Sequence, residues 1–161
     1  MKRMLYAAIV LGWIPTLAVV TGARWMAGEQ LRAQGRTPLK VIRIYTGPDG
    51  KTKAQEYEMP LKAQGRGTEL SETFDVTSLQ FRRTNQEYFN DWHQAPRRQF
   101  AVTLAGEREI ELEGGQKLRL GPGSILLAED TTGKGHILRH VGSRDAISLT
   151  LPLADSSKPV R

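Results

Sequence analysis

The sequence contains no cysteine in its 161 residues. This absence excludes a disulfide-stapled fold, thiolate zinc sites, iron–sulfur clusters and cysteine nucleophiles. It does not fix the compartment, because an exported domain with an adequate core can do without disulfides. Only three histidines are present, so metal chemistry is restricted to one small site.

The motifs of several common enzyme classes are also missing. Lys134 is not a phosphate-binding P-loop lysine, because no Gly-x-x-x-x-Gly pattern precedes it. There is no nucleophile elbow, no locally supported Ser/His/Asp signature and no internal repeat. With 39% hydrophobic and 25% charged residues, the chain is neither a disordered tail nor a polytopic membrane protein. Its length suits one domain.

The net charge of +6 is unevenly distributed along the chain. Residues 1–66 carry eleven Lys or Arg against four Asp or Glu, whereas residues 67–161 carry twelve against thirteen. A nucleic-acid-binding domain would concentrate its basic residues on a recognition surface. The balanced C-terminal part lacks such an excess, and we expect no nucleic-acid partner.

A run of twenty uncharged residues, 4–23, follows Lys2 and Arg3. A basic start, an apolar stretch and small residues at 21–23 are typical of a secretory signal peptide. An uncleaved membrane anchor is the alternative, because twenty helical residues span a hydrocarbon core of about 30 Å, and a buried helix is a third. We favour export, which makes the protein periplasmic or extracellular, or anchored to the membrane by this segment.

The remaining chain reads as a linker (24–38), one β domain (39–153) and a flexible tail (154–161). Short segments rich in β-branched residues alternate with glycine-bearing turns, and no convincing long helix is found. The expected strands are Leu39–Tyr45, Lys53–Leu61, Phe74–Thr84, Arg98–Leu104, Arg108–Leu112, Gln116–Leu120, Ser124–Ala128, His136–Val141 and Ala146–Leu151. This pattern predicts a β-sandwich or β-barrel.

Alternation along the strands indicates which side chains share a face. In the segment 108–113, Ile110 and Leu112 lie on one face and three glutamates lie on the other, which indicates a core face and a solvated face. In the segment 136–141, His136 and His140 share a face. His93 and Gln99 share another, provided that no bulge separates them.

Two segments resemble the motifs of the cupin superfamily. Residues 93–106, from His93 to Gly106, resemble the first motif, which runs His-x-His, three or four residues, Glu, six residues, Gly. Gly121–Gly123, followed by Thr131–His136, is similar to the second, which runs Pro-x-Gly, two residues, His, three residues, Asn. The resemblance implies an all-β domain, a cupin-type double-stranded β-helix (jelly-roll) barrel. In such a barrel the strands run antiparallel and both motifs feed one pocket.

Transferred position by position, the resemblance places the family's metal ligands on His93, Ala95, Gln99 and His136, and its Asn on His140. Ala95 has no donor atom and Gln99 offers only a neutral carbonyl oxygen, so the standard metal site is incomplete. A rebuilt site is the alternative, in which His93, His136 and His140 bind a divalent ion such as Zn, Fe, Mn, Ni or Cu.

These observations lead to one functional hypothesis and its alternatives. We expect an exported single-domain cupin that binds a small polar or carboxylate-bearing molecule in the barrel mouth. The expected lining is His93, Gln99, His136, His140 and Arg97, with Arg98 as the alternative arginine. The alternatives are a metal-dependent oxygenase, isomerase or lyase that uses the histidines, and a metal-free acid–base catalyst. The cupin resemblance also implies a homodimer through Leu39–Leu61.

Overall fold

The structure is a computed structural model that describes residues 37–156. The predicted signal or anchor segment (4–23), all but two residues of the predicted linker and residues 157–161 lie outside the described residues. Apart from Thr37, the described residues belong to one compact unit, Pro38–Arg161. Within them, no helix is long and apolar enough to cross a membrane.

The described residues form β-strands joined by turns, with no helix among them. The strand bounds are β1 Lys40–Thr46, β2 Thr52–Glu58, β3 Lys62–Gly65, β4 Thr68–Leu70, β5 Gln80–Thr84, β6 Phe89–His93, β7 Gln99–Ala105, β8 Glu107–Glu111, β9 Lys117–Leu120, β10 Ile125–Glu129, β11 His136–Val141 and β12 Ala146–Pro152. The prediction of an all-β domain is confirmed for this part of the chain.

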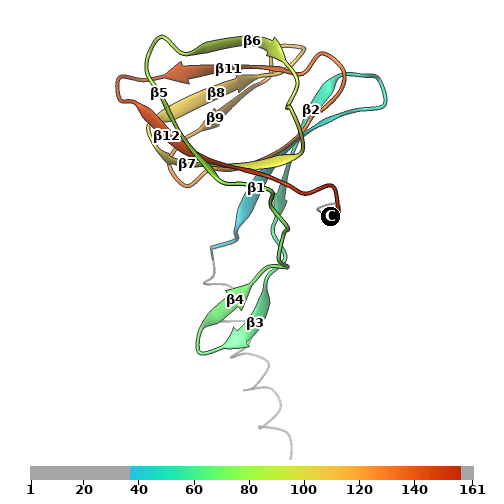
Figure 1. Cartoon of the computed structure of the whole chain (residues 1–161), viewed down its shortest axis with the longest axis vertical. Helices are drawn as coiled ribbons and strands as arrows, with labels where there is room; N and C mark the ends of the chain where they lie inside the picture. The colour runs from blue at the N-terminus through green and yellow to red at the C-terminus, as the bar shows by residue number, and fades with distance from the viewer. Residues whose placement is uncertain (1–36, 157–161) are drawn as a thin grey trace, which may run out of the picture. The chain divides into compact units, whose positions relative to one another are not determined.

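Two sheets enclose the interior, as Figure 1 shows. The larger sheet has the order β2-β1-β10-β7-β12-β5, and the smaller has the order β6-β11-β8-β9. Strands β5 to β12 alternate between the sheets, except that β8 and β9 are consecutive neighbours in the smaller sheet. This is the strand order of an eight-stranded jelly roll, which buries one face of each sheet against the other.

The hairpin of β1 and β2 extends the larger sheet beyond those eight strands. Its strands pair antiparallel around a turn at residues 47–50, and Gly50 supplies the positive φ of 74° that the turn requires. However, β1 pairs with β10 in parallel, with Ile42 opposite Leu126. The prediction of a wholly antiparallel barrel is therefore wrong at this pair. A parallel pair needs a long crossover connection, which the chain between β2 and β10 provides.

The predicted strand Phe74–Thr84 forms only over its last five residues, as β5. Its first part instead passes over the outer face of the larger sheet, where Phe74 packs edge-on against Phe100 with ring centroids 5.1 Å apart. The short hairpin of β3 and β4 was not predicted, and neither was β6. The exposed pattern of β3 and β4 gives no apolar alternation from which to infer strands.

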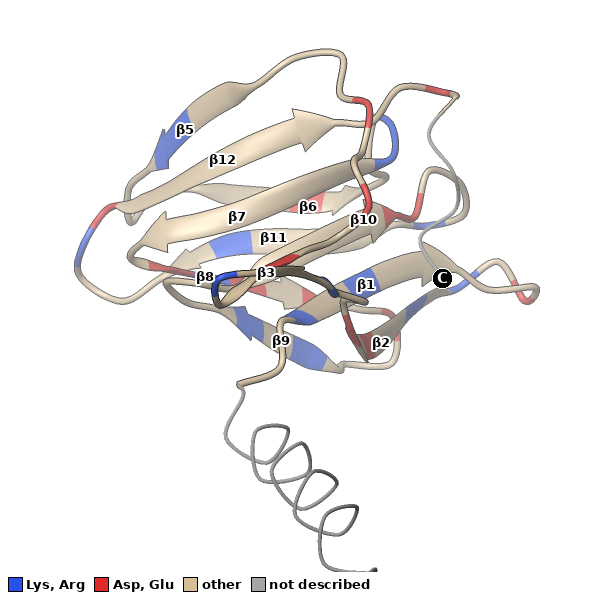
Figure 2. Cartoon of the chain, turned by 90° about the horizontal axis from the view of Figure 1, so that it is seen from below, with Lys and Arg blue, Asp and Glu red and all other residues tan. Residues whose placement is uncertain are grey.

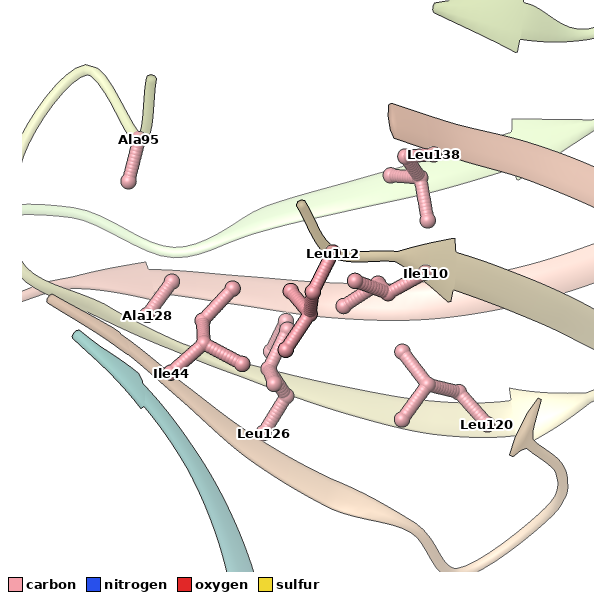
Figure 3. Packing of buried hydrophobic residues seen from close by; sticks show 9 residues of the cluster. Ile44, Ala95, Ile110, Leu112, Leu120, Leu126, Ala128 and Leu138 are labelled. Atoms are coloured by element: carbon pink, nitrogen blue, oxygen red, sulfur yellow. The ribbon is translucent and has the colours of Figure 1, made fainter. Parts of the chain in front are cut away.

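The core divides into an interior cluster between the sheets and an outer cluster on the larger sheet. Alternation along β10 separates them, because Leu126 and Ala128 join the interior cluster while Leu127 joins the outer one. Figure 3 shows the interior cluster, with side chains from both sheets converging. Full burial of one such leucine contributes about 1.5–3 kcal/mol, so this layer is the main source of stability in the interior.

The glutamate face of β8 is less solvated than the alternation predicted. Figure 2 shows acidic positions on β8 flanked by basic positions on β9 and β11. Glu109 is 7% exposed because Arg139 and Arg119 cover it, at 2.6 Å and 2.9 Å respectively. Hydrogen bonding from Arg139 holds the pKa of Glu109 below its usual value. The face is therefore a network of ion pairs on the outside of the smaller sheet.

Candidate functional site

The candidate site is built around a buried pair of Asp130 and His136. Asp130 directly follows β10, and the alternation of Leu126 and Ala128 continues through it, so its side chain is directed inward. Asp130 is 0% exposed and His136 is 4% exposed. The Nδ1–H of His136 donates to Oδ2 of Asp130 at 2.6 Å. This bond fixes the tautomer of the neutral imidazole and leaves Nε2 as its acceptor.

His93 lies beside this pair because β6 and β11 are adjacent, with His93 opposite His136 in the register. The two ring centroids are 4.4 Å apart, and the rings are tilted by 52°. The Nδ1–H of His93 donates to the carbonyl oxygen of Asp91 at 2.7 Å. Burial lowers the pKa of His93, and the adjacent His136 acts in the same direction. In the neutral form of His93, the bond to Asp91 leaves Nε2 as the acceptor.

The loop between Asp130 and His136 is fixed against the end of β6. The backbone N–H of Ala95 donates to the carbonyl of Asp130 at 3.1 Å, and Nε2 of Gln94 donates to the carbonyl of Gly133 at 2.6 Å. Gly135 has a φ of +78°, and a Cβ at this position would clash with the carbonyl oxygen of His93. Only glycine permits this approach, so the loop sequence directly determines how closely the two histidines meet.

Two positions of the cupin-like motif, Ala95 and Gln99, lie in the loop after β6 and at the start of β7. Ala95 is 3% exposed and belongs to the interior cluster, as Figure 3 shows. Gln99 is half-buried at the start of β7, on the face that alternation shares with Ala101 and Thr103. The structure thus directs Gln99 to the interior side of the sheet, while Ala95 supplies a methyl group where a cupin supplies an imidazole.

His140 does not join the two other histidines. It lies four residues after His136 on β11, which is about 13 Å along a strand, and Leu138 lies between them on the same face. The predicted metal site of His93, His136 and His140 is therefore not brought together. Within residues 37–156, no group of three or more His, Asp or Glu side chains could hold a metal ion.

The two arginines that were expected to line the pocket differ in their surroundings. Arg97 is exposed, with no hydrogen bond or ion pair to either histidine among the described residues. Arg98 pairs with Oε1 of Glu129 at 2.7 Å, and Arg43 pairs with Oε2 of the same carboxylate at 2.6 Å. Alternation places Glu129 on the outer face. Burial, together with the charge of Glu129, raises the pKa of Tyr57 to about 12 there.

The sequence interpretation missed Asp130 as a residue of the candidate site. The stretch 129–135 reads as a polar, glycine-rich loop outside the core, and this reading is wrong for its first two residues. The side chains of Glu129 and Asp130 are only 8% and 0% exposed. Extending the alternation of the preceding strand by one step would have directed Asp130 inward, six residues before a histidine.

Comparisons with known proteins add little to this geometry. No family model matches the sequence, and no curated protein matches it. Among solved structures, the chain is similar to one from Salmonella typhimurium LT2, provisionally assigned as ethanolamine utilization protein Q. The identity is 14% and the TM-score is 0.38, over 78% of this chain and 100% of that chain. The chain is thus characterised by its own strand order, as an all-β domain of two facing sheets.

Proposed function

We propose that the chain is an exported, single-domain cupin that binds a small polar or carboxylate-bearing molecule beside His93 and His136. One observation carries the proposal: both imidazoles have Nδ1 bonded to a fixed acceptor, and the rings are held 4.4 Å apart. Fixed rings lose little rotational freedom on binding, which favours a ligand that meets their Nε2 atoms.

The Asp130–His136 pair can bind a ligand that donates a hydrogen bond or a ligand that accepts one. In the neutral form, Nε2 of His136 accepts a hydrogen bond from a hydroxyl, amide or carboxylic acid group. In the protonated form, the carboxylate of Asp130 stabilises the imidazolium, and Nε2–H donates to a carboxylate. A hydroxy acid offers both kinds of group and is the ligand class we expect.

Membership of the cupin superfamily is supported by the jelly-roll strand order and by the adjacency of the two motif segments. The four-ligand metal site of the superfamily does not fit this chain. Ala95 has no donor atom, and the described residues offer no group of three acidic or histidine ligands. The proposed binding therefore uses only the protein's own hydrogen-bonding groups.

Binding is tested by NMR of the 15N-labelled histidine rings during titration with lactate. We expect saturable shifts of the Nε2 resonances of His93 and His136, and loss of the His93 shift in His136→Gln. His140→Gln is the matched control, because His140 is also buried but lies on the far side of Leu138. Shifts that fail to saturate, or that persist in His136→Gln, would rule out this site for hydroxy acids.

A metal-free acid–base enzyme is the second candidate, favoured by the buried Asp130–His136 bond. A carboxylate that orients an imidazole and stabilises its charged form is the arrangement of a general base. The methyl protons of pyruvate in D2O provide a probe of proton abstraction. Exchange faster than in buffer, and abolished by His136→Gln, would favour the enzyme. Absence of exchange alongside saturable binding would favour the binding protein.

Export through residues 4–23 completes the proposal and has its own test. Residues 1–27 are fused to a reporter that is active only outside the cytoplasm, and intact mass then separates cleavage from anchoring. An inactive reporter would contradict export without affecting the proposed binding site.

A further inference from the structure

The opposite end of the interior contains a second polar pair, Arg108 on β8 and His140 on β11. These residues are direct cross-strand partners, so their Cβ atoms are about 4.5–5.5 Å apart. Arg108 shares the inward face of β8 with Ile110, two residues later. His140 shares the inward face of β11 with Leu138, two residues earlier, and both apolar residues belong to the interior cluster. Arg108 is 4% exposed and His140 is 8% exposed.

Neither side chain has the partners that its burial requires. Nη2 of Arg108 donates to Oγ1 of Thr103 at 3.2 Å, but its buried Nε–H has no acceptor. Both ring nitrogens of His140 are buried without a partner. Among the described residues, no carboxylate forms an ion pair with Arg108.

The surroundings of this pair are basic or neutral. Burial lowers the pKa of Arg108, and the nearby Arg82 acts in the same direction. Arg82 is exposed, and its Nη1 is 3.3 Å from the hydroxyl of Tyr88. The end of the interior that contains Arg108 and His140 thus has an uncompensated positive charge.

A buried guanidinium without a counter-ion is strongly unfavourable. A carboxylate would accept from Nε–H of Arg108 and from a ring N–H of His140, which satisfies two of the orphaned groups at once. Because Arg108 is the one permanently charged residue of the buried pair, a monovalent anion balances it. A phosphate dianion would leave an excess negative charge.

We propose that Arg108, His140 and Thr103 form an anion site for a small monocarboxylate, distinct from the site at His93 and His136. The Leu138 layer separates the two, since His136 and His140 lie about 13 Å apart along β11. The exposed Arg82 at this end attracts anions toward it.

The test compares thermal unfolding in sodium acetate and in sodium chloride at equal ionic strength. We expect acetate to raise the Tm of the wild-type protein by roughly 3 °C or more at saturation. The increase should become smaller in Arg108→Met, which keeps the side-chain length, because only the site at His93 and His136 then remains for acetate. Arg144→Gln, which removes an exposed arginine from the turn between β11 and β12, should retain the full increase. The part of the increase that is lost in Arg108→Met should persist in His136→Gln.

A direct measurement keeps the proposal testable if Arg108→Met does not fold. In the wild-type protein, the Nε–H resonance of Arg108 should shift saturably with acetate and remain in place with chloride. An equal effect of chloride, a larger effect of phosphate, or no effect of acetate would overturn the proposal. No effect of acetate would mean that water alone satisfies these groups.

Discussion

The two ends of the interior contain similar residue types but differ in how they are satisfied. At one end, His136 is bonded to the carboxylate of Asp130 and His93 is bonded to a backbone carbonyl. At the other, Arg108 and His140 retain three buried nitrogens without partners. At the first end, Oδ1 of Asp130 is also buried without a partner, but its hydrogen bonds hold both histidines in one arrangement. The second end, with three such atoms, gains more free energy when a ligand arrives. The difference predicts opposite responses to substitution.

The largest effect is expected from Gly135→Ala at the end that contains His93 and His136. The added Cβ meets the backbone of His93, and the positive φ of +78° is strained for alanine. We expect a loss of about 4 kcal/mol in the free energy of unfolding, measured by urea denaturation. Gly123→Ala is the control, because it has a similar φ of +83° but open space around the Cβ. Equal losses in the two variants would show that the contact with His93 is unimportant.

Asp130→Ala should have the next largest effect. It leaves Nδ1–H of the buried His136 without an acceptor, and we expect a loss of about 3 kcal/mol. The free energy of unfolding is measured by denaturant titration at pH 7. Asp130→Asn, which retains an acceptor oxygen, should lose clearly less. If the two variants are equally stable, the bond to His136 does not stabilise the fold.

The opposite sign is expected for His140→Leu. This substitution replaces a buried imidazole with two unpartnered nitrogens by an apolar side chain on the same face of β11 as Leu138. In buffer without carboxylates, we expect stability to rise by about 1 kcal/mol, because no hydrogen bond is lost. Thermal unfolding in a carboxylate-free buffer provides the measurement. A marked destabilisation would indicate that His140 has a partner within the protein.

The smallest effect concerns pH and His93. Its pKa is lowered in the folded protein, chiefly by burial, so the unfolded chain binds the proton more strongly. Stability from this group is present above a pH of about 6.5 and is lost as the pH falls through the lowered value. The Tm of the wild-type protein should therefore fall more between pH 7 and pH 5 than that of His93→Gln. Parallel curves would contradict the burial of a neutral His93.

Buried residues at both ends of the interior could in part be predicted from the sequence by the alternation of side chains along a strand. Alternation along β8 correctly placed Ile110 and Leu112 inward, and the same rule includes Arg108, two residues earlier. Alternation along β10 likewise leads to Asp130. Both were passed over because an isolated charge at a strand end is usually solvated, and burial there depends on the facing sheet.

Other parts of the site depend on contacts between distant segments. Strand register determines which arginine pairs with Glu129. The distance along β11 determines whether His140 reaches His136. The family motif aligned His93 and His136 on adjacent strands. It gave no indication that a leucine layer divides the interior between the two histidines of β11.

The parallel pairing of β1 with β10 has a consequence for how the chain folds. Apart from the pairing of β1 with β2, each pairing in the larger sheet joins strands that are not consecutive in sequence. Such contacts require large loops to close before they provide any stabilising energy, which makes folding slow. Of the strands in this sheet, β1 and β2 are synthesised first. Until β10 has been synthesised, the edge of β1 that pairs with it has no partner. During this interval a nascent chain is exposed to mispairing with other strands.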